Sequence, residues 1–337
     1  KKLHKELENG EINLLIGTHA LLEDKVQYQN LGLVVIDEQH RFGVAQRAKM
    51  WEKNKRPPHI LVMTATPIPR TLAMTLYGDL DISIIDELPP GRKEVKTIWK
   101  SDKNRLQIFG FIYEEIKKGR QIYIVYPLIK ESQKLDYKDL MDGYESICRR
   151  FPEQQISIVH GKMKSEDKDF EMNRFTKGET QIMIATTVIE VGVNVPNASV
   201  MIIESAERFG LSQLHQLRGR VGRGAEQSFC ILMSGEKLSD DACKRLKTMT
   251  NTCDGFEISE VDLKLRGPGN LMGTQQSGVL NLKIANLIKD GAILKIAREE
   301  AIKIIDEDPY MSSEKNKIIL QNMKKRKNNS IEWMRIS

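Results

Sequence analysis

The sequence predicts an α/β fold, with two lobes built on mainly parallel sheets and a small helical region after them. Three observations lead to this prediction. Short β-branched runs alternate with amphipathic helical patterns from the start to about residue 235, as is typical of α/β proteins. Continuously apolar runs such as Leu-Val-Val-Ile at 33–36 suit strands covered on both faces, and hence a parallel sheet. Beyond residue 235, helical patterns follow one another without strands between them.

Each expected strand is a short, mainly apolar run. These runs lie at 13–17, 32–37, 59–64, 121–126, 156–160, 181–186, 199–203 and 228–233. Amphipathic patterns predict helices at 70–77, 105–117, 137–149, 165–176, 211–218, 238–250, 257–265 and 284–306. Residues 1–8 resemble an exposed helix, and glycine and proline predict a loop at 266–278. The basic run 324–327 is interpreted as a solvated tail rather than a nucleic-acid contact.

A domain boundary is expected in residues 86–94. Pro89, Pro90 and Gly91 cannot continue a helix or a central strand. Alternation of strands and helices restarts at Val95. We therefore expect a partial first lobe at 1–88, a second lobe at 89–235 and a helical region at 236–337.

The composition excludes several classes of protein. The four cysteines form no C-x-x-C pair and no zinc spacing, so they are expected to be reduced thiols rather than a disulfide framework. No stretch approaches the ~20 apolar residues of a membrane span, and we expect a cytoplasmic protein. The net charge of +6 is compatible with a polyanionic partner but does not establish one.

An acidic pair follows the apolar run 33–36, in the segment Asp37-Glu38-Gln39-His40. Carboxylates at the C-terminal end of a strand project into the crevice where open α/β sheets bind ligands. In nucleoside triphosphatases such an aspartate holds Mg²⁺ and the glutamate orients the attacking water. Taken alone, a solvated strand end or a helix N-cap explains such a pair more often.

Two threonines, Thr64 and Thr66, follow the apolar run 60–63. Their hydroxyls could form hydrogen bonds with Asp37 or His40 across neighbouring strand ends. The alternative is an ordinary Ser/Thr turn at the start of a helix.

The segment 216–223, Gln-Leu-Arg-Gly-Arg-Val-Gly-Arg, is the most specific signal. Its glycines let the backbone approach a partner closely. Arg220 and Arg223 supply planar, permanently charged donors suited to phosphate oxygens, and from a second lobe they could act on a γ-phosphate. A basic surface loop is the alternative.

Further polar residues close strands in both lobes. Thr186 and Thr187 end the run 181–186 and could hold a nucleic-acid phosphate, although a strand-end turn explains them equally well. Gly17-Thr18-His19 and His160-Gly161-Lys162 each close a strand, one in each lobe. One nucleic-acid strand lying across both lobes would account for this pair, while a structural or surface histidine is the alternative.

Together these segments, in this order, resemble the motifs of superfamily two helicases, whose two RecA-like lobes bind ATP in the cleft between them. The resemblance covers residues 11–235. Finer features are similar to the RecG family of helicases; they lie at 37–44, 64–81, 126–129 and 213–224. Residues 262–278 resemble the helical hairpin and loop that this family shares with the transcription-repair coupling factor, where it links ATP-driven lobe movement to translocation on double-stranded DNA.

The resemblance implies ATP and Mg²⁺ as cofactors and gives each residue a role. Asp37 would hold Mg²⁺ and Glu38 would be the general base. The resemblance places further residues in the nucleotide site, or in its coupling to the nucleic-acid track: His40, Thr64, Thr66, Gly192, Asn194, Gln216, Arg220 and Arg223. Residues implied along the nucleic-acid track and in the translocation loop are Thr18, His19, His160, Gly161, Thr186, Arg266, Gln275 and Gln276.

The sequence also departs from the family pattern. No G-x-x-x-x-G-K-[ST] phosphate loop occurs, and we expect it, with the DNA-binding wedge domain, to lie upstream in a longer parent protein. Asn194 stands where the family usually has Asp, which would weaken a ribose or arginine contact, and Gln275 stands where many members have Arg, which would change the phosphate contacts of the loop.

The parent protein is therefore expected to be a monomeric, ATP-dependent translocase on branched or duplex DNA that remodels stalled forks and Holliday junctions, whereas this chain alone should not hydrolyse ATP. Two alternatives stay open at this point: the motor of a transcription-repair coupling factor, and a non-catalytic nucleic-acid-binding protein.

Overall fold

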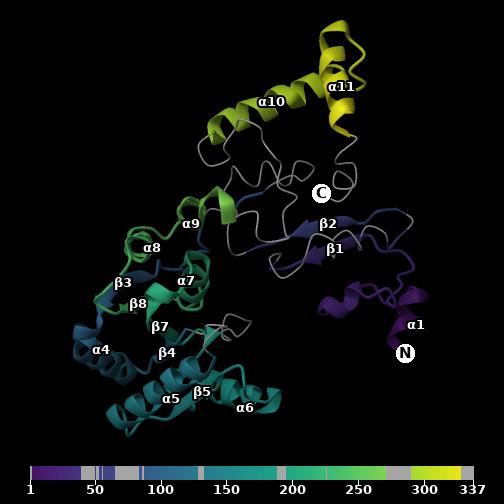
Figure 1. Cartoon of the computed structure of the whole chain (residues 1–337). Helices are drawn as coiled ribbons and strands as arrows, with labels where there is room; N and C mark the ends of the chain where they lie inside the picture. Colours follow the sequence, from purple (N-terminus) through teal and green to yellow (C-terminus); the bar gives the residue numbers. More distant parts are fainter. Residues whose placement is uncertain are drawn as a thin grey trace. The chain divides into compact units, whose positions relative to one another are not determined.

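The computed structural model describes residues 2–38, 50, 53–54, 56–64, 83–85, 87–127, 133–187, 195–224, 226–270 and 290–327 (Figure 1). Contacts divide the chain into two compact units. Unit 1 comprises residues 1–83 and 266–337, and unit 2 comprises residues 84–265. Each unit is described by itself.

Unit 2 is built on a six-stranded parallel sheet with the order β3-β8-β7-β4-β6-β5. The strands are β3 (Lys96–Ser101), β4 (Gln121–Val125), β5 (Ile156–Val159), β6 (Ile182–Ala185), β7 (Ala198–Ile203) and β8 (Phe229–Ser234). Every residue of β4, β6 and β7 is buried, as expected for central parallel strands covered on both faces. The strand order reverses between β4 and β7, and open sheets of this kind bind ligands beyond the carboxyl ends of such strands.

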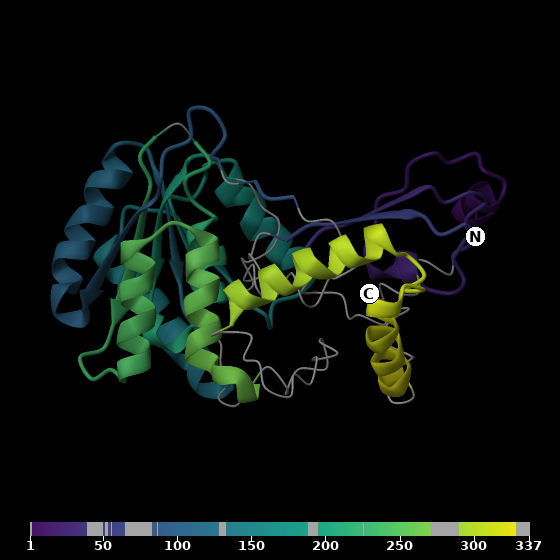
Figure 2. The ribbon, with the colours of Figure 1, turned by 90° about the horizontal axis from the view of Figure 1, so that it is seen from above.

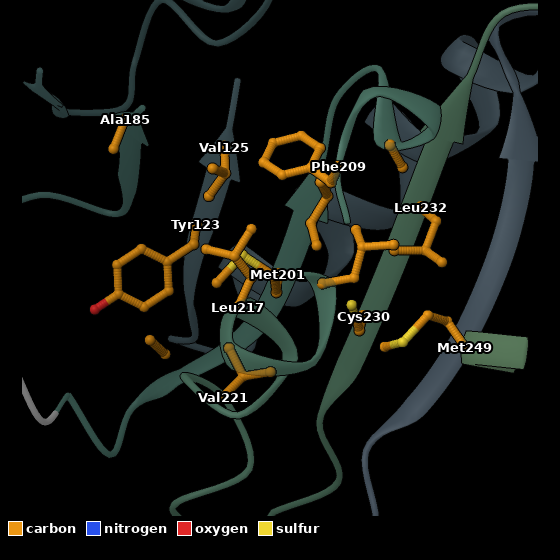
Figure 3. Packing of buried hydrophobic residues seen from close by; sticks show 14 of the residues in the cluster. Tyr123, Val125, Ala185, Met201, Phe209, Leu217, Val221, Cys230, Leu232 and Met249 are labelled. Carbon is orange, nitrogen blue, oxygen red and sulfur yellow. The ribbon is translucent and has the colours of Figure 1, made fainter. Parts of the chain in front are cut away.

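Helices cover both faces of this sheet (Figure 2). They are α4 (Arg105–Lys117), α5 (Gln133–Arg150), α6 (Ser165–Thr176), α7 (Leu211–Arg218), α8 (Asp240–Asn251) and α9 (Gly255–Asn270). Successive residues of β4 point to opposite faces. Ile122 and Ile124 pack in the core beneath α4 and α5, whereas Tyr123 and Val125 pack in the core shared with α7 and α8. Figure 3 shows this second core, including Leu217 of α7 and Met249 of α8.

In unit 1, β1 (Leu33–Ile36) and β2 (His59–Val62) form a parallel pair in which Ile36 lies opposite Val62. One face of the pair packs on Leu22 and Met50. The unit also contains α1 (Lys2–Glu8), the 3-10 helix η1 (His19–Leu22), α10 (Gly291–Glu307) and α11 (Glu314–Lys327). None of the described helices combines the length and apolar character that crossing a bilayer requires.

The α/β fold class is confirmed, and the helices expected at 105–117, 165–176 and 211–218 form at those residues. The strand expected at 13–17 is wrong. Leu14 and Ile16 are exposed there, and among the described residues no neighbouring strand supplies the ladder hydrogen bonds that a strand needs. The loop expected from residue 266 is also wrong over 266–270, since α9 continues through them. The helix expected at 70–77 lies outside the described residues.

Two elements were not expected from the sequence. Strand β3 mixes lysine and serine with Trp99 and pairs with β8 alone, at an edge of the sheet. Helix α11 spans Glu314–Lys327, for which no helix was predicted.

The two units also divide the chain differently from the expected domains at 1–88, 89–235 and 236–337. Contacts separate it after residues 83 and 265. The reason lies in the packing of α8 and the start of α9: Leu246, Met249 and Ile258 belong to the same core as the strands of unit 2.

Candidate functional site

The acidic pair lies directly after β1. Asp37 is exposed and Glu38 is half-buried. The backbone N–H of Glu38 donates to Oδ1 of Asp37 over 2.9 Å, and Glu38 has a φ of +53°. A left-handed backbone costs a residue other than glycine on the order of 1–2 kcal/mol. Such strain is found preferentially at functional sites, because selection there tolerates it.

Thr64 follows β2 at the same edge of the sheet. The N–H of Met63 donates to the carbonyl of Ile36 over 2.8 Å, which aligns the chain after β2 with the chain after β1. The structure therefore brings the segments that bear Asp37 and Thr64 to the same end of the parallel pair β1–β2. His40 and Thr66 lie outside the described residues.

The donor set at this edge fits Mg²⁺ carried by a nucleotide. Within the described ranges there is no group of three or more His, Cys, Asp or Glu residues that could hold a metal ion. Mg²⁺ in phosphate-transferring sites is typically held by one or two carboxylates, with phosphates and water completing its shell. The exposed carboxylate of Asp37 suits that arrangement.

Of the three arginines in segment 216–223, Arg218 has a structural position. It is 4% exposed, and its Nη1 donates to the carbonyls of Met249 (3.0 Å) and Thr252 (2.9 Å) at the C-terminal end of α8. Helix α8 has no basic residue in its own last turn, so Arg218 supplies the cation that its terminal carbonyls favour.

His215 completes this contact. Its Nδ1 lies 3.1 Å from Nη2 of Arg218. Arginine is a donor only, so Nδ1 must accept. Burial, and then the charge of Arg218, lowers the pKa of His215 to about 4, and the ring is consequently neutral near pH 7.

The loop 219–224, called the arginine loop below, carries Arg220 and Arg223. Gly222 has a φ of +78°, and a Cβ there would lie 2.7 Å from Cγ2 of Val95. A Cβ at Gly224 would lie 2.8 Å from the carbonyl oxygen of Pro196. Both glycines are thus required by backbone conformation or close packing.

The charges of Arg220 and Arg223 both affect the pKa of Tyr123, a residue of β4. Burial raises the pKa of Tyr123 to about 12, and the guanidinium charges of Arg220 and Arg223 both oppose that rise. Because Coulomb forces fall with distance, both charges are close enough to the Tyr123 phenol to affect it. Arg220 and Gln216 are half-buried, and Arg223 is exposed.

The residues expected along a nucleic-acid track in unit 2 lie at two adjacent strand ends. His160 and Gly161 follow β5, Thr186 follows β6, and the N–H of Thr186 donates to the carbonyl of Val159 over 3.2 Å. Burial, and then the charges of Lys168 and Lys162, lowers the pKa of His160.

The side chain of Thr186 is 1% exposed, and its hydroxyl has no hydrogen-bond partner in the part of the chain that the structure describes. In unit 1, Thr18 and His19 are exposed at the start of η1. Arg266 lies on α9, but its side chain is outside the described residues, as are Gly192, Asn194, Gln275 and Gln276.

Sequence reasoning missed an ion pair at the carboxyl ends of β4 and β7. Glu204 is 6% exposed and accepts from both terminal nitrogens of Arg105, at 2.7 and 2.8 Å. Arg105 also donates to Asp102 over 2.7 Å. The only sequence signal was a glutamate directly after an apolar run.

Comparisons with known proteins show which families the chain resembles. Family models match residues 1–75 (DEAD/DEAH box helicase), 105–225 (helicase conserved C-terminal domain) and 252–337 (ATP-dependent DNA helicase RecG, domain 3, C-terminal). The ATP-dependent DNA helicase RecG of Synechocystis sp. is 52% identical over 93% of the chain, and that of Bacillus subtilis is 50% identical over 92%. The chain belongs to the RecG helicase family.

Solved structures point the same way. A RecG bound to a three-way DNA junction is 44% identical and superposes on 87% of this RecG-family chain with a TM-score of 0.66. The DNA-bound helicase MrfA, 15% identical with a TM-score of 0.51, shares the fold alone. The chain spans 38% of the Synechocystis relative, 45% of the Bacillus relative and 37% of the solved RecG chain.

Proposed function

We propose that this chain is the motor part of an ATP-dependent DNA helicase, which translocates on duplex DNA and remodels branched DNA such as stalled forks and recombination junctions. The observation that carries the proposal is the arginine loop, which bears both Arg220 and Arg223 and is fixed by two closely packed glycines. Membership of the RecG family supports it and argues against a transcription-repair coupling factor.

In this proposal the residues of unit 1 prepare the hydrolytic water. Bound Mg²⁺ would neutralise charge on the phosphates and orient them. Asp37 would hold that ion with its exposed carboxylate, and Glu38 would accept the proton of the water that attacks the γ-phosphate. The left-handed backbone of Glu38 is a strained conformation of the kind that clusters at active sites. Thr64 and Thr66 would couple the nucleotide site to the nucleic-acid track, and His40 would belong to the nucleotide site.

The residues of unit 2 would stabilise the transition state and hold DNA. Arg220 and Arg223 would donate to phosphate oxygens as negative charge develops, and Gln216, Gly192 and Asn194 would complete the nucleotide site. Thr18, His19, His160, Gly161 and Thr186 would line the nucleic-acid track, with Arg266, Gln275 and Gln276 in the translocation loop. Such contacts to the phosphate backbone position DNA without reading its sequence.

By itself the chain is proposed not to hydrolyse ATP, since its 337 residues contain no G-x-x-x-x-G-K-[ST] loop to cradle the β- and γ-phosphates. The full activity belongs to the intact protein that contains this chain, which we propose acts as a cytoplasmic monomer.

The test is ATP turnover by the intact protein, with and without a three-way DNA junction. We expect Glu38→Gln to lower DNA-stimulated turnover about 100-fold or more, since general-base catalysis contributes at least this much. Arg223→Ala should lower it about 1000-fold, the lower end of an arginine finger's contribution. Arg149→Ala, which removes an exposed arginine at the end of α5, is the matched control and should leave turnover unchanged. No turnover by the unaltered protein would favour a non-catalytic nucleic-acid-binding role, and equal turnover in all four proteins would overturn the roles given to Glu38 and Arg223.

A further inference from the structure

Near the start of unit 2, Pro89-Pro90-Gly91-Arg92 form a tight turn. The N–H of Arg92 donates to the carbonyl of Pro89 over 3.1 Å, and Gly91 has a φ of +80°. A proline at the second position and a positive φ at the third are the features of a type II turn. Because proline restricts the backbone, Arg92 leaves this turn in a defined direction.

The side chain of Arg92 reaches the arginine loop. Its Nε donates to the carbonyl oxygen of Gly222 over 2.8 Å, and the side chain is half-buried. A hydrogen bond from a guanidinium is roughly twice as strong as one between neutral groups. The accepting carbonyl belongs to the planar peptide group that joins Gly222 to Arg223. A hydrogen bond to that carbonyl therefore fixes the orientation of the peptide plane that contains the backbone nitrogen of Arg223.

Neighbouring contacts keep the same two segments together. Val95 packs against Gly222 so closely that a Cβ there would lie 2.7 Å from its Cγ2. The side-chain amide of Gln227 donates to the carbonyl of Glu94 over 2.8 Å. The N–H of Lys96 donates to the carbonyl of Ser228 over 3.0 Å, where the pairing of β3 with β8 begins. Residues 92–96 thus run beside residues 222–228.

We propose that Arg92 is a positioning residue for the arginine loop. It touches neither nucleotide nor DNA in this role; it holds the Gly222–Arg223 peptide so that Arg223 and Arg220 are presented together. The turn that carries Arg92 lies within unit 2, near its first residue, and the order of the arginine loop depends on that turn. The consequence for catalysis rests on the proposed function, whereas the effect on loop order does not.

The experiment uses the intact protein and two readouts. The first is amide hydrogen exchange across residues 219–224, measured without nucleotide. The second is kcat and KM for ATP with a three-way DNA junction. The variants are Arg92→Ala and Arg92→Lys, which keeps the charge but not the planar donor. Lys93→Ala is the matched control, because it removes one charge from the same segment and its side chain is exposed. Circular dichroism confirms that each variant is folded.

For Arg92→Ala we expect exchange across 219–224 to rise about tenfold, the effect of losing one partly exposed, charge-assisted hydrogen bond. We expect kcat to fall about tenfold with little change in KM, since the loop acts on the transition state rather than on ground-state binding. Arg92→Lys should recover part of both effects, and Lys93→Ala should show neither.

Unchanged exchange in Arg92→Ala, or the same exchange increase in Lys93→Ala, would overturn the positioning role whatever the turnover. Faster exchange with unchanged kcat would overturn its catalytic part. Failure of the proposed function would instead be seen in Arg223→Ala, which would then leave turnover intact while Arg92→Ala still loosened the loop.

Discussion

Replacing Arg218 with methionine tests how α7 is joined to the C-terminal end of α8. Methionine has a similar length and no charge, so the change removes the guanidinium without leaving a large cavity. The carbonyls of Met249 and Thr252, which accept from Arg218 at 3.0 and 2.9 Å, would lose their partner in a largely buried position. Each unsatisfied buried carbonyl costs on the order of 1–3 kcal/mol.

Part of that loss is offset because a buried guanidinium no longer has to be desolvated. We therefore expect Arg218→Met to lower the free energy of unfolding of unit 2 by about 3 kcal/mol. The assay is native-state hydrogen exchange at the slowest amides of the buried strands β4 and β7, which report global opening of the unit. About 100-fold faster exchange corresponds to this magnitude.

Two variants serve as controls for the Arg218 prediction. Arg218→Lys should lose about half as much, because an ammonium replaces the fork of donors by a point charge. Arg149→Met, on an exposed part of α5, should change stability by less than about 0.5 kcal/mol. The reasoning is refuted if Arg218→Met changes the exchange of β4 and β7 no more than Arg149→Met does.

Three further predictions concern other parts of the chain. Burial lowers the pKa of His215 to about 4, against 6.5 in the unfolded chain, so the stability that its neutral ring contributes is complete above pH 6.5 and is lost as pH falls towards 4. The free energy of unfolding measured in urea should fall by up to about 3 kcal/mol across that window, and by less in His215→Gln. Gly222→Ala should destabilise unit 2 by about 2 kcal/mol in urea unfolding, because alanine is strained at a φ of +78° and meets Val95, whereas Gly110→Ala in α4 has open space and should be neutral or stabilising. Glu38→Asn should leave thermal stability equal or raise it by up to about 1 kcal/mol, since asparagine tolerates left-handed backbone, while turnover of the intact protein is lost; a clear fall in stability would contradict strain at Glu38.

The sequence was most informative where local pattern reports burial directly. Strands β4 and β7 are continuously apolar because both faces are covered, and they were expected almost to the residue. Strand β3 was missed because its partner, β8, lies more than 130 residues away and its own residues are mixed in polarity. The run 13–17 was predicted as a strand for the opposite reason: its composition is apolar, but the fold gives it no partner.

The candidate site shows the same division. The pattern of glycines and arginines at 216–223 identified a phosphate-binding segment without distinguishing its arginines. Arg218 and Arg220 differ little in local sequence, and only the carbonyls of α8 reveal that Arg218 is structural. The role of Arg92 was likewise invisible, because Gly222 lies 130 positions away and a turn sequence does not show what its last residue contacts.

The most direct test of the central claim is a structure of the intact protein with Mg²⁺, a non-hydrolysable ATP analogue and a three-way DNA junction. We predict that guanidinium nitrogens of Arg220 and Arg223 lie about 3 Å from γ-phosphate oxygens, with Asp37 on the metal shell and Glu38 beside the attacking water. A nucleotide bound at Asp37 and Glu38 with both arginines directed away from its phosphates would contradict the claim that the two units act on one nucleotide.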